Sequence, residues 1–165
     1  MIHMNMLILY ASTSGNTELM ADAIADHLNL QGHDVVIKSF DFDRIDVEDI
    51  PKYDAIFVGT HTWDDGELPY EVEDFYEEIE DVDITGKCFG VFGSADSFYD
   101  TYGLAVDLMA DQLKNLGAVV FPERLKVDLT PNDADIIRCQ QFAESVCDMV
   151  VDGKNALESE RERVY

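Results

Sequence analysis

Short apolar runs alternate with amphipathic segments along the whole chain. Five runs have the length and composition of strands: residues 7–10, 34–40, 53–60, 88–93 and 119–121, the last with a continuation to 127. Apolar side chains recur at helical spacing in the segments between and after these runs: residues 17–30, 70–79, 104–116 and, after Pro131, a last segment to 151. The acidic connector at residues 41–52 is expected to form a short or irregular helix ended by Pro51.

This alternation predicts the fold class. Strands that are apolar on both faces and separated by helices are typical of a parallel sheet covered on both sides. Right-handed crossovers then give a doubly wound α/β sandwich. We expect one domain, residues 1–151, followed by a charged tail, 152–165, that is either frayed or a helical extension.

Three polar loops leave the carboxyl ends of the predicted strands. They cover residues 11–17, 61–69 and 94–102. Because ligands of open α/β sheets bind beyond those ends, the three loops are expected to converge on one site.

Composition narrows the class of partner. The 165 residues carry a formal net charge of −24, which argues against nucleic acid and anionic membranes and leaves a basic protein partner or a solvated acidic coat. No apolar run reaches the ~18 residues of a membrane span, and the N-terminus lacks a signal-peptide pattern. Cys88, Cys139 and Cys147 form no CxxC pair, so we expect buried thiols in a reducing cytoplasm and no metal site.

The first loop predicts a phosphate site. It contains no lysine or arginine and matches neither GxxxxGK[ST] nor GxGxxG. Hydroxyl groups and a glycine at a helix N-terminus suit a single terminal phosphate. The candidate residues are Ser12, Thr13, Ser14, Gly15, Asn16 and Thr17, with Asn16 expected in a left-handed or capping conformation. The alternative is an ordinary helix cap with no ligand.

The other two loops carry aromatic residues among polar neighbours in the sequence. Trp63 stands in THTWDDGELP, and Tyr99 and Tyr102 stand in SADSFYDTYG. Such residues often stack on a planar ligand, although Trp63 could fold back on its own helix and Tyr99 could anchor its loop. Two aromatic loops beside a phosphate loop indicate a ligand with a flat ring and a phosphate.

At these three motifs the chain resembles the flavodoxins over almost its whole length. The first loop is similar to the family's [ST]-x-T-G-x-T motif, with Ser14 where threonine is usual. TWDDGELPYEVEDFYE resembles the family's TWGDG segment and the helix after it, and GSADSFYDTYGLAVDLMADQLKNLGA resembles its third loop and fourth helix. The fifth strand lacks the long insertion of long-chain members, so the resemblance is to the short-chain type.

The resemblance implies non-covalent FMN in a five-stranded parallel sheet of order 2-1-3-4-5, with helices on both faces. It also implies a monomeric electron carrier without a substrate of its own, and redox partners such as a ferredoxin or flavodoxin reductase and acceptor enzymes. The phosphate would bind at residues 12–17, the ring between Trp63 and Tyr99, and the pyrimidine edge near Ser94, Asp96 and Tyr102. The remaining predicted contacts are Thr62, Asp64, Asp65, Gly66, Ala95 and Gly103.

Two residues depart from the family pattern. Asp64 occupies a position that is usually glycine, where positive φ costs an aspartate more. His61 occupies a position where a small hydroxyl residue or a tyrosine is expected. If protonated it would add positive charge near the phosphate; the alternative is a solvent-facing histidine.

Acidic residues gather before and around the second loop. Residues 41–83 contain seventeen carboxylates against Arg44 and Lys52. These carboxylates are expected to lower the potential of a bound flavin and to attract a basic partner, or else to form a solvated face.

Other functions of the same fold class lack their expected residues. A signalling receiver domain needs acidic residues where the first strand ends, and here that strand ends in Tyr10-Ala11-Ser12. An FMN-dependent quinone reductase would need a nicotinamide site, which the sequence does not indicate. A cofactor-free interaction module would leave the aromatic residues as surface contacts.

Overall fold

The computed structural model describes residues 2–62 and 67–164. Its strands are β1 (Asn5–Tyr10), β2 (Asp34–Ser39), β3 (Ala55–Gly59), β4 (Cys88–Ala95), β5 (Val119–Val120) and β6 (Leu125–Asp128). Its α-helices are α1 (Asn16–Leu30), α2 (Tyr70–Glu78), α3 (Leu104–Asn115) and α4 (Asp133–Val164). Two 3-10 helices, η1 (Val47–Lys52) and η2 (Ile79–Asp81), complete the described elements. The predicted alternation of strands and helices is confirmed.

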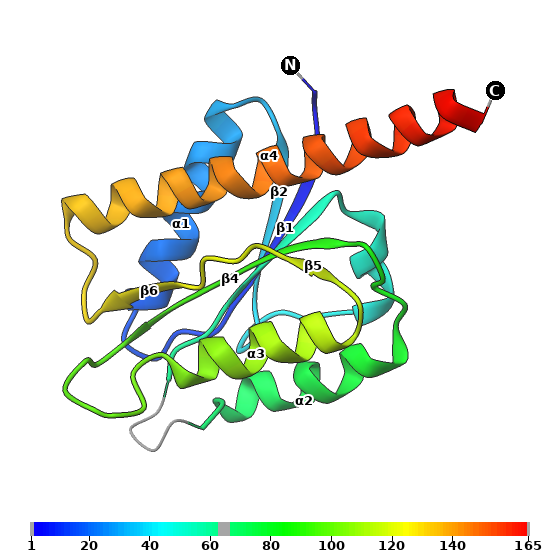
Figure 1. Cartoon of the computed structure of the whole chain (residues 1–165). Helices are drawn as coiled ribbons and strands as arrows, with labels where there is room; N and C mark the ends of the chain where they lie inside the picture. The colour runs from blue at the N-terminus through cyan, green and yellow to red at the C-terminus, as the bar shows by residue number, and fades with distance from the viewer. Residues whose placement is uncertain (1, 63–66, 165) are drawn as a thin grey trace.

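The strands form one parallel sheet whose main order is β2-β1-β3-β4-β5, as predicted (Figure 1). The fifth strand, however, is not continuous: β5 pairs with the start of β4, and β6 pairs with its end. The break contains Pro122, which has no N–H to donate to a neighbouring strand. The second piece carries the chain up to the same edge at which β4 ends, since Ala95 is the partner of Asp128.

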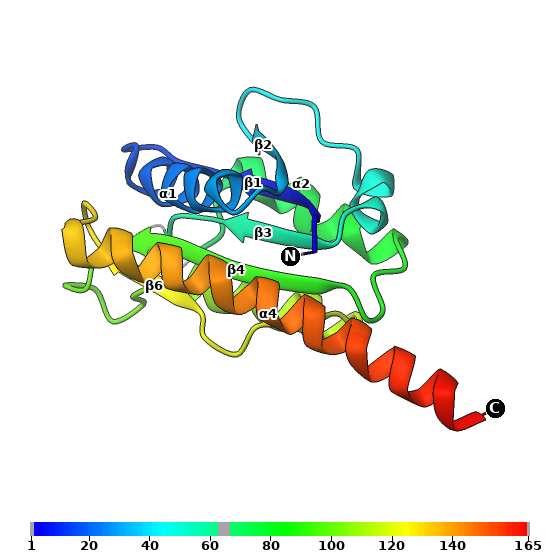
Figure 2. The same ribbon diagram turned by 90° about the horizontal axis from the view of Figure 1, so that it is seen from above.

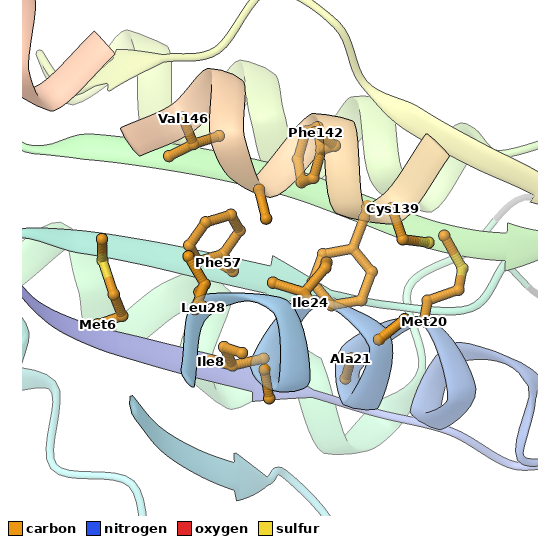
Figure 3. Packing of buried hydrophobic residues seen from close by; sticks show 14 of the residues in the cluster. Met6, Ile8, Met20, Ala21, Ile24, Leu28, Phe57, Cys139, Phe142 and Val146 are labelled. Atoms are coloured by element: carbon orange, nitrogen blue, oxygen red, sulfur yellow. The ribbon is translucent and has the colours of Figure 1, made fainter. Parts of the chain in front are cut away.

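Alternating side chains of the central strands supply two cores, one on each face. On β1, Met6 and Ile8 join the core beneath α1 and α4, whereas Leu7 and Leu9 join the core beneath α2 and α3. Figure 3 shows the first of these, where Phe57 of β3 packs with Phe142 of α4 at a centroid distance of 5.9 Å. Successive side chains of a strand point to opposite faces of the sheet, so strands that are apolar throughout make both faces apolar. Each face must therefore be covered by helices.

Helix α4 is longer than the sheet that it covers. Its 32 residues correspond to about 48 Å, and it runs past Val151 without a break. Figures 1 and 2 show the last turns projecting beyond the rest of the protein, and residues 152–161 are exposed. Lys154 still reaches back to Asp54, at 3.1 Å between Nζ and Oδ1. The segment predicted as a charged tail thus continues the last helix as far as Val164.

The three cysteine side chains are free thiols, and burial is the main influence on their pKa values. Cys139 is buried between α4 and the sheet, and burial raises its pKa to about 11. Burial likewise raises the pKa of Cys147 to about 12. Both thiols are held in the unreactive protonated form at neutral pH.

We predict that Gly93→Ala strongly destabilises the fold. A Cβ at Gly93 would lie 1.9 Å from the carbonyl oxygen of Thr60 and 2.7 Å from Val106 Cγ2, so β3 or α3 would have to move. We expect a loss of about 3 kcal/mol or more in the free energy of unfolding, measured with urea. Gly32→Ala is the control: its φ is +87° and a Cβ there meets nothing within 4 Å, so only the left-handed conformation is penalised, by about 1–2 kcal/mol. Equal losses in the two variants would contradict the close approach of β3 and β4.

We also predict that His33 makes stability depend on pH. The N–H of Met4 donates to His33 Nδ1 at 3.1 Å, so this buried ring must be neutral at that atom. Burial, and then the nearby His3, lower the pKa of His33. As the folded pKa lies below the unfolded one, the unfolded chain takes up the proton first, and stability is lost as the pH falls below about 6.5.

The measurement compares the wild-type chain with His33→Asn, whose side-chain oxygen can accept the same N–H without titrating. The difference in unfolding free energy between the two proteins should move against the wild type by about 1 kcal/mol, the worth of one buried hydrogen bond, between pH 7.5 and 5. Carboxylates and His3 titrate in both proteins and largely cancel. A difference that stays constant with pH would contradict the prediction.

Candidate functional site

Loops from the carboxyl ends of β1, β3 and β4 meet at one pocket of about 150 Å³, as the three predicted loops require. A fourth segment, which follows β6, joins them. The pocket is lined by Thr13, Ser14, Asn16, His61, Thr62, Ser94, Ala95, Asp96 and Leu129. Seven of these lining residues belong to the predicted site. Of the other two, His61 was expected near the phosphate as a departure from the family pattern, and Leu129 was not predicted.

Gly15 makes the turn from β1 into α1. It precedes the first helical residue and has φ = +90°, a conformation that is free for glycine, and a Cβ there would meet nothing within 4 Å. The expectation that Asn16 would take a left-handed or capping conformation is therefore wrong. Gly15 is the N-cap, Asn16 is the first residue of the helix, and Asn16 Oδ1 accepts a hydrogen bond from Thr130 Oγ1. Ser12 Oγ closes the turn by accepting the N–H of Gly15 at 3.1 Å and that of Glu18 at 3.3 Å.

The first turn of α1 offers free donors to the pocket. Within the described part of the chain, the N–H groups of Ser14, Asn16 and Thr17 have no acceptor. They lie at the positive end of the α1 dipole, beside the hydroxyls of Thr13 and Ser14. The lining includes no lysine or arginine. This donor set fits a phosphate monoester, which backbone N–H groups and hydroxyls can hold without a cationic side chain.

A buried pair of hydroxyls joins the first loop to β4. Thr17 Oγ1 and Ser94 Oγ lie 2.7 Å apart, and both side chains are buried. The N–H of Ser94 also points to Thr17 Oγ1, at 3.4 Å. The hydroxyl of Thr17 is thus engaged by Ser94, so only its backbone N–H is left to act as a donor at the start of α1.

His61 lies between the first loop and α2. Its Nε2 is 3.0 Å from Thr13 Oγ1 and 3.9 Å from Glu71 Oε1, and its Nδ1 is 3.3 Å from the carbonyl oxygen of Ala11. Its side chain is only 12% exposed. The alternative of a solvent-facing histidine is therefore wrong, because the ring is enclosed by two loops and a helix.

The third loop is held by its own polar contacts. The carboxylate of Asp128, at the end of β6, accepts both the N–H of Ser97 at 3.0 Å and its hydroxyl at 2.6 Å. These two bonds hold the pKa of Asp128 below its ordinary value. Asp96 Oδ1 accepts the N–H of Phe98. The Ser97–Asp128 contact joins residues 31 apart and was not predicted.

Two aromatic side chains project from this loop. Phe98 is 85% exposed and Tyr99 is 37% exposed, and their rings meet edge-on with centroids 5.5 Å apart. Tyr102 is partly buried, and burial raises its pKa. Gly103 has φ = +67° and is the N-cap of α3. Tyr99 thus contacts the ring of Phe98 within the loop and keeps about a third of its surface exposed.

The second loop is described only at its ends. Thr62 Oγ1 accepts the N–H of Ala105 at 3.2 Å and so ties the loop to the start of α3. The predictions for Trp63, Asp64, Asp65 and Gly66 fall on residues outside the described part of the chain.

Acidic residues reach the site only in part. Helix η1, with Glu48 and Asp49, precedes β3 and so lies at the end of the sheet opposite the site. Asp96 lines the pocket, and Glu71 contacts His61. In residues 2–62 and 67–164, no cluster of three or more histidine, cysteine, aspartate or glutamate side chains is arranged for a metal ion, and no helix is long and apolar enough to cross a membrane.

A doubly wound parallel sheet with this phosphate cradle and two loops beside it defines a class of nucleotide-binding α/β proteins. Comparison with known proteins gives the family. The family model described as "Flavodoxin" matches residues 8–149, so the chain belongs to the flavodoxin family. It is a short-chain member, an FMN-binding electron carrier, as the resemblance implied.

Individual relatives agree over most of the chain. "Probable flavodoxin 1" of Bacillus subtilis (strain 168) is 41% identical over 138 residues, which cover 83% of this chain and 86% of that protein. The crystal structure of oxidised flavodoxin 1 from Bacillus cereus superimposes with a TM-score of 0.83 at 40% identity, covering 87% of this chain and 97% of the other. A short-chain flavodoxin associated with a bacterial microcompartment gives a TM-score of 0.83 at 35% identity, covering 88% and 98%.

We predict that Thr17→Val costs about 2 kcal/mol of unfolding free energy. Valine keeps the shape of the side chain but leaves the buried Ser94 hydroxyl and N–H without their partner. In Thr17→Val/Ser94→Ala the orphaned hydroxyl is gone, so the double variant should lose about 1 kcal/mol less than the sum of the two single variants. Urea unfolding of all four proteins measures the coupling. Strict additivity would show that the pair does not hold the loop to β4.

Proposed function

We propose that the chain is a low-potential one-electron carrier of the cytoplasm that works as a monomer and has no substrate of its own. Its partners are basic redox proteins, among them a ferredoxin or flavodoxin reductase and acceptor enzymes. The observation that supports this best is the donor set at the start of α1, which suits one phosphate monoester and provides no lysine for a second or third phosphate.

The phosphate end of FMN is assigned to the first loop. The N–H groups of Ser14, Asn16 and Thr17, which have no acceptor among the described residues, would donate to it, and Thr13, Ser14 and Asn16 line the pocket. Ser12 and Gly15 act through the shape of the turn, since the Ser12 hydroxyl accepts two N–H groups of the turn itself. All six predicted phosphate residues thus have a part, but not the same part.

The ring end is assigned to the second and third loops. Tyr99 would stack on one face of the ring, and Trp63 on the other. Backbone groups of Ser94, Ala95 and Asp96 lie on the pocket side of β4, where they would meet the polar edge. Thr62 ties the second loop to the start of α3 by accepting the N–H of Ala105, and Gly103 is the N-cap of α3. The parts of Tyr102, Asp64, Asp65 and Gly66 stay predictions.

When bound, FMN supplies reversible electron uptake, and reduction adds negative charge to the ring. Carboxylates near the ring oppose that charge. A carboxylate ~10 Å away at an effective dielectric of ~40 opposes it by roughly 0.8 kcal/mol, or about 35 mV for one electron. Asp96, with Asp100 and Asp128 on and beside the third loop, is placed to act in this way. The potential is therefore expected to be low.

The net charge of −24 acts at longer range. It would draw a positively charged protein toward the site and repel nucleic acid and anionic lipid. Phe98 is exposed at the rim of the third loop and offers such a partner an apolar contact.

To test this proposal, we predict that the chain binds FMN stoichiometrically and that variants at the phosphate end and at the ring end of the site have different effects. The full-length chain should bind one FMN, quench its fluorescence and undergo reversible one-electron reduction at a potential below that of free FMN. Ser12→Ala, which loosens the phosphate turn, should weaken FMN about tenfold and riboflavin hardly at all. Tyr99→Ala should weaken both ligands about tenfold, because both contain the ring.

Equilibrium fluorescence titrations measure the affinities, and spectroelectrochemistry measures the potential. Ser97→Ala is the matched control for loop damage, since its hydroxyl bonds Asp128 rather than the ligand pocket. If Ser12→Ala weakened FMN and riboflavin equally, or if Tyr99→Ala weakened neither ligand, the assignment of the two ends would be wrong. A potential equal to that of free FMN would contradict the low-potential carrier.

A further inference from the structure

His61 is the one described lining residue of the pocket that can become positively charged. It is not part of the hydroxyl-rich loop. It comes from the segment after β3 and reaches Thr13, 48 residues earlier, at 3.0 Å. A phosphate monoester bound at Thr13 and the first turn of α1 would therefore have a single titratable base close to it among the residues that the structure describes.

The contacts of the ring show which nitrogen titrates. The carbonyl oxygen of Ala11 can only accept, so Nδ1 carries a proton and donates it there in both charge states. Nε2 is then the atom that gains or loses a proton, and it faces Thr13 Oγ1. In the neutral ring the Thr13 hydroxyl donates to Nε2. In the protonated ring Nε2–H donates to Thr13 Oγ1, and the hydroxyl proton of Thr13 is released to point into the pocket.

Among the described residues, the charged groups near the ring are carboxylates. Glu71, on α2, places Oε1 3.9 Å from Nε2, and its side chain is only 21% exposed. Asp96, at the end of β4, lines the same pocket. From the β1 side the ring meets the neutral groups of Ala11 and Thr13. Glu71 thus places one negative charge near the ring, and a phosphate on the opposite side of Thr13 would place a second one there.

We propose that His61 is a proton-linked positioning residue for the phosphate. Binding of the phosphate group is coupled to protonation of Nε2, which turns the Thr13 hydroxyl toward the ligand and places one positive charge beside it. This inference rests on the proposed location of the phosphate at the first loop. The competing role is purely structural: a neutral His61 would tie the second loop to the first without sensing the ligand.

FMN and riboflavin distinguish these two roles, because only FMN carries the phosphate. We would measure the affinity of both ligands for the full-length chain and for His61→Gln between pH 5.5 and 8.5, in buffers without inorganic phosphate. The phosphate of FMN itself titrates near pH 6, but it does so with both proteins. The ratio of the two proteins' affinities for FMN removes that contribution.

The expected result is a ratio for FMN that rises about tenfold in favour of the wild type as the pH falls across the range in which histidine takes up a proton. The ratio for riboflavin should stay constant over the same range. Calorimetry of FMN binding near neutral pH, in two buffers of different ionisation enthalpy, should show more protons taken up by the wild type than by His61→Gln. In Glu71→Gln the rise should shift to lower pH, because the protonated ring has lost its carboxylate.

Each other outcome overturns a different statement. FMN and riboflavin ratios that change together, or equal proton uptake by the two proteins, would show that His61 has a structural role only. An FMN ratio that is flat with pH would overturn the proton linkage while leaving the FMN site in place. If FMN bound no better than riboflavin to the wild type at any pH, the phosphate site itself would be wrong, which is a failure of the proposed function rather than of His61.

Discussion

The buried bond between Thr17 and Ser94 fixes the geometry on which the site depends. It joins the first turn of α1 to the last residues of β4, two segments 77 residues apart. The phosphate end and the ring end of the proposed site lie on these two segments. A hydroxyl pair is well suited to this position, because each member becomes an orphaned buried polar group if the other moves away.

The site also contains few positively charged side chains. An anionic ligand in a strongly acidic protein needs positive potential, yet the described lining contains no lysine or arginine. Backbone N–H groups at the start of a helix provide that potential at fixed positions and do not titrate. Lys126 and Arg124, which follow β5, are instead engaged by Asp107 on α3, at 2.7 and 3.1 Å. These two side-chain cations are thereby kept in ion pairs.

Much of the fold and part of the site could be predicted from the sequence. Hydrophobic periodicity is a local property of the sequence. The order of strands and helices and the positions of the three loops could therefore be predicted from it. The break in the fifth strand was not predicted, since the strand was expected to continue to residue 127; the structure places Pro122, which cannot donate to a neighbouring strand, in the break. What could not be predicted depends on partners distant in the chain. His61 is enclosed because α2 brings Glu71 against it, and Leu129 lines the pocket because β6 ends beside Ala95. The prediction for Asn16 was wrong for a local reason. Gly15 and Asn16 are adjacent, and the glycine takes the positive φ at no steric cost.

The acidic residues show why composition must be placed in space before it is given a function. Electrostatic interactions are screened over about 8–10 Å at physiological salt, so carboxylates on η1, at the far end of β3, act little on a ring beyond the other end. In the proposed site, the reduction potential of the flavin would therefore depend mainly on a few nearby groups such as Asp96 and Asp128. Attraction of a basic partner is different, because an approaching protein meets the whole charged surface and can come within a screening length of many carboxylates. Charge on η1 and on the outer face of α2 can consequently change with little effect on the redox chemistry while still altering the rate of encounter.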